Sequence, residues 1–178
     1  MPARWQDYAM ENPKEVLRQK LQSLRPHSST GLTSQLRLLV EKLSPAVIAS
    51  YQPMPSEPDV TEFNQWAKEN HRLVFPKVVG SNLEFAEGPL SRGRYGIDEP
   101  TGPRVHQIDL VLVPALAIDQ QGNRLGKGKG FYDRFLASYS GVCFAVVFDE
   151  EVLTELPIES HDRAVSGVIT PKRTIVFN

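Results

Sequence analysis

Residues 108–134 read IDLVLVPALAIDQQGNRLGKGKGFYDR, and they carry the clearest local signals of the fold. Its first part, 108–114, is an almost continuous aliphatic run, which is typical of a strand buried on both faces. The segment 124–130 is rich in glycine, and the aromatic and aliphatic side chains of 132–139 recur at helical spacing. A buried strand, a glycine-rich connection and a helix that begins at the connection form a common anion-binding arrangement.

The loop at 124–130 combines backbone freedom with positive charge. Three glycines at alternate positions leave backbone amides uncovered, and one arginine and two lysines stand between and before them. Asp133 then offers a hard oxygen ligand of the kind that holds Mg²⁺ beside phosphates. The pattern is neither a Walker A loop, in which Ser or Thr follows Gly-Lys, nor a dinucleotide fingerprint. A phosphate-binding loop and a solvated, flexible turn both fit these residues, and the flanking segments favour the former.

The rest of the chain predicts helices that alternate with short strands. We expect helices from Pro13 to just before Arg25-Pro26, at 32–43, at about 60–70 and after the loop, and strands at 46–51, 73–75, 108–114, 142–148 and 174–177. Residues 77–107 are dense in Gly and Pro and predict a long loop with a small hairpin around 80–82. This alternation indicates an α/β layer fold with a mostly parallel sheet.

The composition fits a single domain with an ordinary core. The chain has 178 residues, of which 40% are hydrophobic and 23% charged, and its net charge is −1. Near neutrality gives no overall attraction to nucleic acid or to an anionic membrane, so any basic site must be local. We find neither a membrane-spanning run nor the apolar core of a signal peptide, and we expect a cytoplasmic monomer. Cys143 lies in an apolar run and is expected to be a packed thiol.

Motifs along nearly the whole chain resemble those of the 5-formyltetrahydrofolate cyclo-ligase family. The signature of that family is similar to Asp109 through Pro114, followed by Asp119, Gly122 and the loop from Arg124 to Arg134. The other similar segments, in order, are Lys14 to Arg18, Tyr51 to Asp59, Tyr95 to Pro100, Leu156-Pro157, His161-Asp162 and Val168 to Thr170. The chain departs from common family residues at Val60, Ala115 and Phe131, none of which removes a charged group.

The resemblance implies a fold and a reaction. The expected fold is a three-layer α/β/α sandwich with a mostly parallel, Rossmann-like sheet, similar to the NagB/RpiA/CoA-transferase-like fold, formed by one domain over 1–178. The expected reaction is cyclisation of 5-formyltetrahydrofolate to 5,10-methenyltetrahydrofolate, with ATP and Mg²⁺ as cofactors and phosphorylation of the formyl oxygen. The expected partner is therefore this small molecule, without nucleic acid or membrane.

The resemblance also assigns roles to residues. Lys129 and Arg124 are expected to be catalytic, because they would neutralise charge on the transferring phosphoryl group. The expected ATP-binding residues are Lys14, Arg18, Arg124, Leu125, Gly126, Lys127, Gly128, Lys129, Gly130, Phe131 and Tyr132. The expected substrate-binding residues are Tyr51, Gln52, Glu57 and Tyr132, and the expected metal ligands are Asp133 and Asp162. His161 is expected to have no chemical role.

Some assignments stay open at this point. Glu99 could be a structural cap or a substrate contact, and Arg92 and Arg94 could meet the glutamate tail of a folate. The alternative functions are another sugar- or nucleotide-phosphate enzyme on a similar sheet and a non-catalytic nucleotide- or folate-binding regulator. The retained Lys129 and Asp133 favour an enzyme over a binding module, and one short basic loop disfavours a nucleic-acid binder.

Overall fold

The computed structural model describes residues 12–177, so the N-terminal segment on which the signal-peptide expectation rests lies outside it. Its helices are α1 (Pro13–Leu24), α2 (Leu32–Leu43), α3 (Thr61–Asn70), α4 (Phe131–Leu136) and the short 3₁₀ helix η2 (Asp149–Glu151). Its strands are β1 (Val47–Ala49), β2 (Arg72–Val79), β3 (Asn82–Ala86), β4 (Leu90–Arg92), β5 (Asp98–Pro100), β6 (Leu110–Pro114), β7 (Ala117–Ile118), β8 (Arg124–Leu125), β9 (Val142–Val146), β10 (Gly167–Ile169) and β11 (Thr174–Val176).

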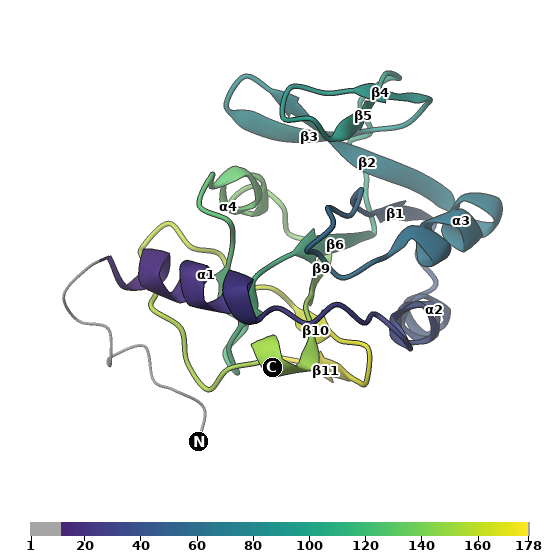
Figure 1. Ribbon diagram of the computed structural model, residues 1–178. Coiled ribbons are helices and arrows are strands. Elements are labelled where there is room, and N and C mark those ends of the chain that lie inside the picture. The colour runs from purple at the N-terminus through teal and green to yellow at the C-terminus, as the bar shows by residue number, and fades with distance from the viewer. Residues whose placement is uncertain (1–11, 178) are drawn as a thin grey trace.

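Seven strands form the central sheet, in the order β11-β10-β9-β6-β1-β2-β3. The strands from β10 to β2 run parallel to their neighbours, whereas β11 and β3 pair antiparallel at the two edges. In Figure 1, α2 and α3 lie on one side of this sheet and α4 lies on the other. The predicted layered α/β fold with a mostly parallel sheet is therefore confirmed.

Strand β6 shows why the aliphatic run at 108–114 predicts a central strand. Successive side chains of a strand point to opposite faces. Leu110 and Leu112 accordingly pack in the cluster beneath α2 and α3, and Val111 and Val113 pack in the cluster that α4 covers. Both faces of β6 are buried, so its sequence is continuously apolar instead of alternating between apolar and polar residues.

Helix α1 lies apart from the two large clusters. Its Leu17 packs with Leu116, Ala117, Leu125 and Leu156 in a smaller cluster beyond the end of β6. Pro13 occupies the first turn, where no backbone donor is needed, and the side chain of Asn12 accepts a hydrogen bond from the Lys14 backbone N–H at 3.1 Å. The fold thus places a cationic helix near the carboxyl ends of the parallel strands.

The region 77–107 contains more strand than its composition predicts. The hairpin around 80–82 is confirmed, but β2 extends through Pro76 to Val79, and β4 and β5 form a second hairpin that was missed. Pro76 is paired with Phe85 of β3, and it lies beyond Val74, the last residue of β2 that pairs with β1, so it stands where β2 has a partner strand on one side only. Strand β10 was also missed. Within residues 12–177, no helix is long and apolar enough to cross a membrane.

Candidate functional site

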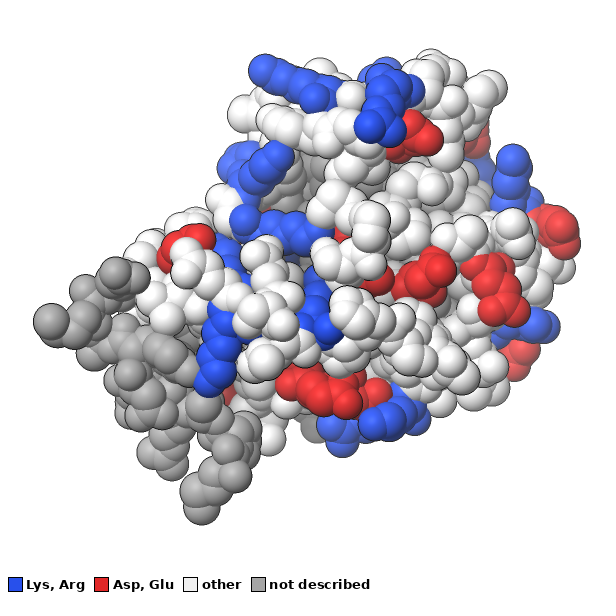
Figure 2. Space-filling model, in the orientation of Figure 1, with Lys and Arg blue, Asp and Glu red and all other residues white. Residues whose placement is uncertain are grey.

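A pocket of about 450 Å³ opens at the carboxyl ends of β1 and β6. It is lined by α1, the turn after β1, parts of β2 and β3, the β4–β5 hairpin, the glycine-rich loop, α4 and the segment 159–162. Every residue assigned above to catalysis or to binding ATP, folate or metal lines this one pocket, whereas Arg92 and Arg94, left open for the glutamate tail, do not line it. Figure 2 shows Lys and Arg side chains gathering on the face between α1 and the β4–β5 end of the molecule.

The glycine-rich loop has a backbone that only glycine adopts easily. Gly128 and Gly130 have φ values of 97° and 68°, in the left-handed region. A side chain at Gly128 would also meet the Arg18 guanidinium at 3.4 Å, so this arginine packs directly on the bare backbone. Arg18 Nε donates a hydrogen bond to the Gly126 carbonyl at 2.8 Å. The loop and α1 therefore fix each other, and Arg18 lies where the sequence predicts a phosphate ligand.

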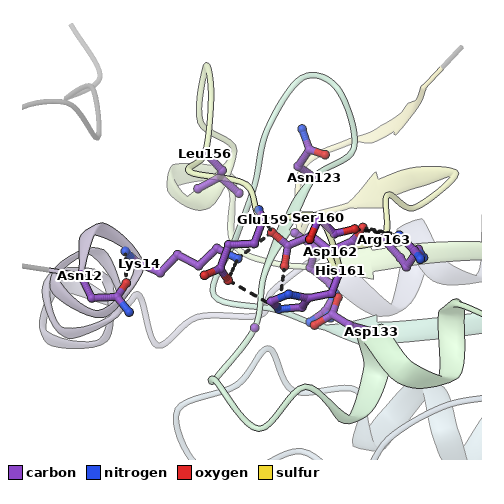
Figure 3. Close-up of polar contacts among 12 residues, drawn as sticks. Asn12, Lys14, Asn123, Asp133, Leu156, Glu159, Ser160, His161, Asp162 and Arg163 are labelled. Carbon is purple, nitrogen blue, oxygen red and sulfur yellow. Dashed lines mark hydrogen bonds and ion pairs between the residues drawn. The ribbon is translucent and has the colours of Figure 1, made fainter.

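Lys14 joins α1 to the segment 159–162. Its Nζ donates hydrogen bonds to Asp162 Oδ2 and Glu159 Oε2, each at 2.6 Å, although the residues are almost 150 positions apart. Figure 3 shows the lysine side chain extending from α1 to these carboxylates. The hydrogen bond from Lys14 lowers the pKa of Glu159 below its usual value. Burial acts to raise the pKa of Asp162. The hydrogen bonds from Lys14 and from the Glu159 backbone N–H outweigh this effect and hold the Asp162 pKa below its usual value.

A compact group of potential metal ligands includes one predicted residue and two that were not predicted. Ligand atoms of Glu159, His161 and Asp162 all lie within 4.8 Å of one another. Asp133 lines the same pocket from α4 and is not part of this group. Carboxylate oxygens suit Mg²⁺, so Glu159 and Asp162 of this group fit the predicted ion. His161 was expected to have no chemical role, and its ring lies 3.5 Å from Glu159 and 3.8 Å from Asp162.

Arg124 is held rigidly at the base of the loop. Its side chain is 3% exposed, and its Nη2 donates to Asp133 Oδ1 at 2.9 Å. Its guanidinium lies 5.7 Å from the centre of the Tyr132 ring. Among the described residues, the buried Arg124 Nε and the buried Tyr132 hydroxyl have no hydrogen-bond partner in the protein. Such orphaned groups in a pocket wall are available to a ligand.

Glu57 and Lys127 form a direct contact between the predicted folate-binding and phosphate-binding residues. Lys127 Nζ lies 2.6 Å from Glu57 Oε1, and the Met54 backbone N–H donates to Glu57 Oε2 at 2.8 Å. The Glu57 side chain is 7% exposed, so this carboxylate is largely withdrawn from water. Burial, reinforced by the negative charge of Glu57, raises the pKa of the nearby Tyr51 and Tyr132 hydroxyls. Both tyrosines therefore stay neutral at ordinary pH.

Lys129 differs from the other two loop cations. Arg124 and Lys127 are paired with carboxylates, whereas Lys129 Nζ lies 3.5 Å from the centre of the Tyr95 ring. Within residues 12–177, no ion pair to a carboxylate is found for Lys129. Its charge is thus held by a weak cation–π contact and is not neutralised.

The pocket also contains residues that the sequence did not predict. They are Asn12, Met54, Pro76, Val78, Leu83, Tyr95, Ile97, Pro114, Ala115, Glu159 and His161. Glu159 lies three positions before Asp162 in a tight turn, a spacing that could have signalled it. Glu99, left open above, lines the pocket, and its Oε1 also accepts a hydrogen bond from the Val78 N–H at 3.2 Å. It therefore links the β4–β5 hairpin to β2.

The fold and this pocket define an α/β protein with a basic, glycine-rich loop and a group of carboxylates at the carboxyl ends of parallel strands. The sequence model of the 5-formyltetrahydrofolate cyclo-ligase family matches residues 10–171. The chain therefore belongs to the 5-formyltetrahydrofolate cyclo-ligase family and is an enzyme of that family.

Individual relatives agree with this membership. A 5-formyltetrahydrofolate cyclo-ligase of Mycolicibacterium smegmatis is 37% identical, over 76% of this chain and 78% of the relative. The Escherichia coli K12 protein of the same name is 25% identical, over 89% and 98%. The structure of Aquifex aeolicus 5,10-methenyltetrahydrofolate synthetase superposes with a TM-score of 0.82 and 32% identity, over 93% of each chain. A Mycoplasma pneumoniae synthetase, at 23% identity and a TM-score of 0.73, shares the fold.

Proposed function

We propose that this protein converts 5-formyltetrahydrofolate and ATP into 5,10-methenyltetrahydrofolate, ADP and phosphate, with Mg²⁺ as the metal ion. The formyl oxygen on N5 attacks the γ-phosphorus of ATP, and the bond from that phosphorus to ADP breaks. N10 then attacks the activated formyl carbon and loses its proton, and the former formyl oxygen leaves as part of the phosphate. Such a reaction needs positioned groups and neutralised charge rather than a protein nucleophile.

The observation that carries this proposal is the 2.6 Å contact between Glu57 and Lys127. The edge of a pterin carries N–H donors, and a buried carboxylate such as Glu57 can accept hydrogen bonds from them. Lys127 belongs to the loop proposed to bind phosphates. A folate bound at Glu57 would therefore lie next to a triphosphate bound at the loop, and direct attack on phosphorus requires such neighbouring sites.

The remaining residues of the pocket fit defined tasks. Lys14 and Arg18, one turn apart on α1, would present two cations to the triphosphate. Arg124, with its unpartnered Nε, would donate to a phosphate oxygen, and Lys129 would neutralise the transferring group. The Tyr132 hydroxyl lacks a partner in the described protein and would hydrogen-bond to bound substrate.

Asp133 and Asp162 are the proposed holders of Mg²⁺, with Glu159 as an additional carboxylate near Asp162. The bound ion would neutralise charge on the β- and γ-phosphate oxygens. The cations of Lys14 and Arg124 contact Asp162 and Asp133, respectively, and so compensate the negative charge of each carboxylate. Lys14 and Arg124 would thus serve both the metal ligands and the phosphates.

Replacing Asp133 by Asn is expected to raise the Mg²⁺ concentration needed for half-maximal activity by about ten- to a hundred-fold. The amide keeps the shape and can still accept from Arg124, but it removes the anionic charge that holds the ion. The measurement is turnover as a function of Mg²⁺ at saturating ATP. Asp98→Asn, on the exposed surface of β5, is the control with the same change. An unchanged Mg²⁺ requirement in Asp133→Asn would argue against ligation.

Isotopic labelling of the formyl oxygen tests the proposed reaction itself. If the formyl oxygen attacks phosphorus, ¹⁸O placed on that oxygen must appear in the released phosphate, at one atom per turnover. Mass spectrometry of the phosphate measures the transfer. Label that stays with the folate or enters water would reject phosphorylation of the formyl group, even where ring closure occurs.

A further inference from the structure

Helix α1 carries two of the proposed phosphate ligands but has a limited apolar anchor. Leu17, with Leu21 beside it, contributes to a small cluster beyond the end of β6, separate from the two large clusters that hold the other helices. The helix ends at Leu24, and Arg25 follows in an extended conformation before Pro26. The direction of α1 must therefore be set partly by polar contacts.

Arg25 supplies such a contact from within the protein. Its side chain is only 1% exposed. Its Nη2 donates to the Ala115 carbonyl at 2.6 Å and to Glu151 Oε2 at 3.2 Å. Arg25 Nε and Glu151 Oε1 also lie 2.7 Å apart as an ion pair that lacks hydrogen-bond geometry. The guanidinium further lies 5.5 Å from the centre of the Phe148 ring.

These partners lie in the segments that follow two neighbouring strands of the central sheet, β6 and β9. Ala115 directly follows β6 and lines the pocket, and Glu151 belongs to η2, which follows β9. Glu151 also accepts from the Phe148 backbone N–H at 2.9 Å, which fixes its carboxylate. Arg25 thus ties the C-terminal end of α1 to a wall residue of the pocket and to the segment after β9.

The Arg25–Glu151 pair is poorly explained by stability alone. Removing two charges from water costs about as much as their attraction returns, so a buried ion pair is a weak source of net stability. Burial raises the pKa of Glu151 to about 7 even though Arg25 opposes the rise. The pair instead fixes the orientation of the Arg25 side chain. A planar guanidinium that donates to two different acceptors has little rotational freedom.

We propose that Arg25 and Glu151 are positioning residues that set where α1 presents Lys14 and Arg18 to the phosphate-binding loop. This inference rests on the proposed function, because it assigns these two cations to the nucleotide. It concerns residues that contact neither nucleotide nor folate in that function. A shift at the end of α1 would move Arg18 away from Gly126 and Gly128, which it touches, and weaken the cradle for the triphosphate.

The test uses Arg25→Met, the double variant Arg25→Met/Glu151→Met, and Glu150→Gln as the matched control on the neighbouring exposed carboxylate. Assays are run at pH 8, where Glu151 of the wild type is ionised. The measured quantities are the KM values for Mg·ATP and for 5-formyltetrahydrofolate, kcat, and amide hydrogen exchange over residues 13–24. The double variant is included because it leaves no unpaired buried charge and is expected to fold even where Arg25→Met does not.

We expect both Arg25 variants that fold to raise the KM for Mg·ATP by about ten-fold or more, with a much smaller change in the KM for folate. Exchange over 13–24 is expected to be faster in both, and Glu150→Gln should match the wild type. A double variant with wild-type KM for Mg·ATP, or equal rises in both KM values, would overturn the positioning role. If the wild type itself shows no turnover, the proposed function fails. Hydrogen exchange still tests the anchoring of α1 in that case, because unchanged amide exchange over residues 13–24 in the Arg25 variants would reject it.

Discussion

Replacing Lys129 by Ala is expected to lower kcat by about a hundred- to a thousand-fold, the usual effect of removing one preorganised donor to developing charge. Lys129 is the loop cation that no carboxylate neutralises among residues 12–177, since its Nζ lies over the Tyr95 ring. An ammonium held by a ring can move onto a phosphoryl oxygen without breaking an ion pair. Arg124 and Lys127 would have to weaken existing contacts with Asp133 and Glu57.

The measurement for Lys129→Ala is the initial rate of methenyl chromophore formation at saturating ATP and folate. Circular dichroism and thermal unfolding should match the wild type, because Lys129 is exposed and does not belong to the buried core. Lys172→Ala removes a lysine that is 73% exposed and should leave kcat unchanged. A kcat within a few-fold of the wild type in Lys129→Ala would eliminate its proposed catalytic role.

Replacing Glu57 by Gln is expected to raise the KM for 5-formyltetrahydrofolate by about ten- to a hundred-fold, with a smaller effect on Mg·ATP. Hydrogen bonds to a charged group contribute about 1.5–3 kcal/mol, which corresponds to this range. The amide keeps the size of the side chain and can still accept from the Met54 N–H, but it loses the charge that favours pterin donors.

Separate titrations of the two substrates test the Glu57 prediction. Glu69→Gln, an exposed carboxylate on α3, is the control for a general loss of negative charge. Glu57 also contacts Lys127, so a modest rise in the KM for Mg·ATP is expected as well. Equal rises for both substrates would reject the assignment of Glu57 to the pterin, because they would indicate a disturbed loop instead.

The sequence predicts the fold and the site well where the informative residues lie close together in short segments. The glycine-rich loop, the aliphatic run of β6 and the Pro13 helix start each have a local physical signal, and each is found where expected. The residues to which the resemblance assigns catalytic or binding roles also converge on one pocket. Family resemblance, rather than spacing, linked Asp162 to that pocket.

The sequence predicts poorly what depends on contacts between distant segments. Strands such as β4, β5 and β10 are three residues long and lack a recognisable period, so their pairing partners stabilise them. The contacts of Lys14 with Asp162 and of Arg25 with Glu151 join opposite ends of the chain. Arg25 in particular has the sequence pattern of a helix end before proline, and only the fold reveals it as a buried cation.

The most direct test of the account is the near-ultraviolet absorbance of 5-formyltetrahydrofolate mixed with the purified protein, with ATP and Mg²⁺ added separately and together. We expect the methenyl chromophore to grow only when both ATP and Mg²⁺ are present, with one ADP formed per ring closed. Absence of the chromophore in a folded protein that still binds Mg·ATP would contradict cyclo-ligase activity and leave the loop as a nucleotide-binding site with another use.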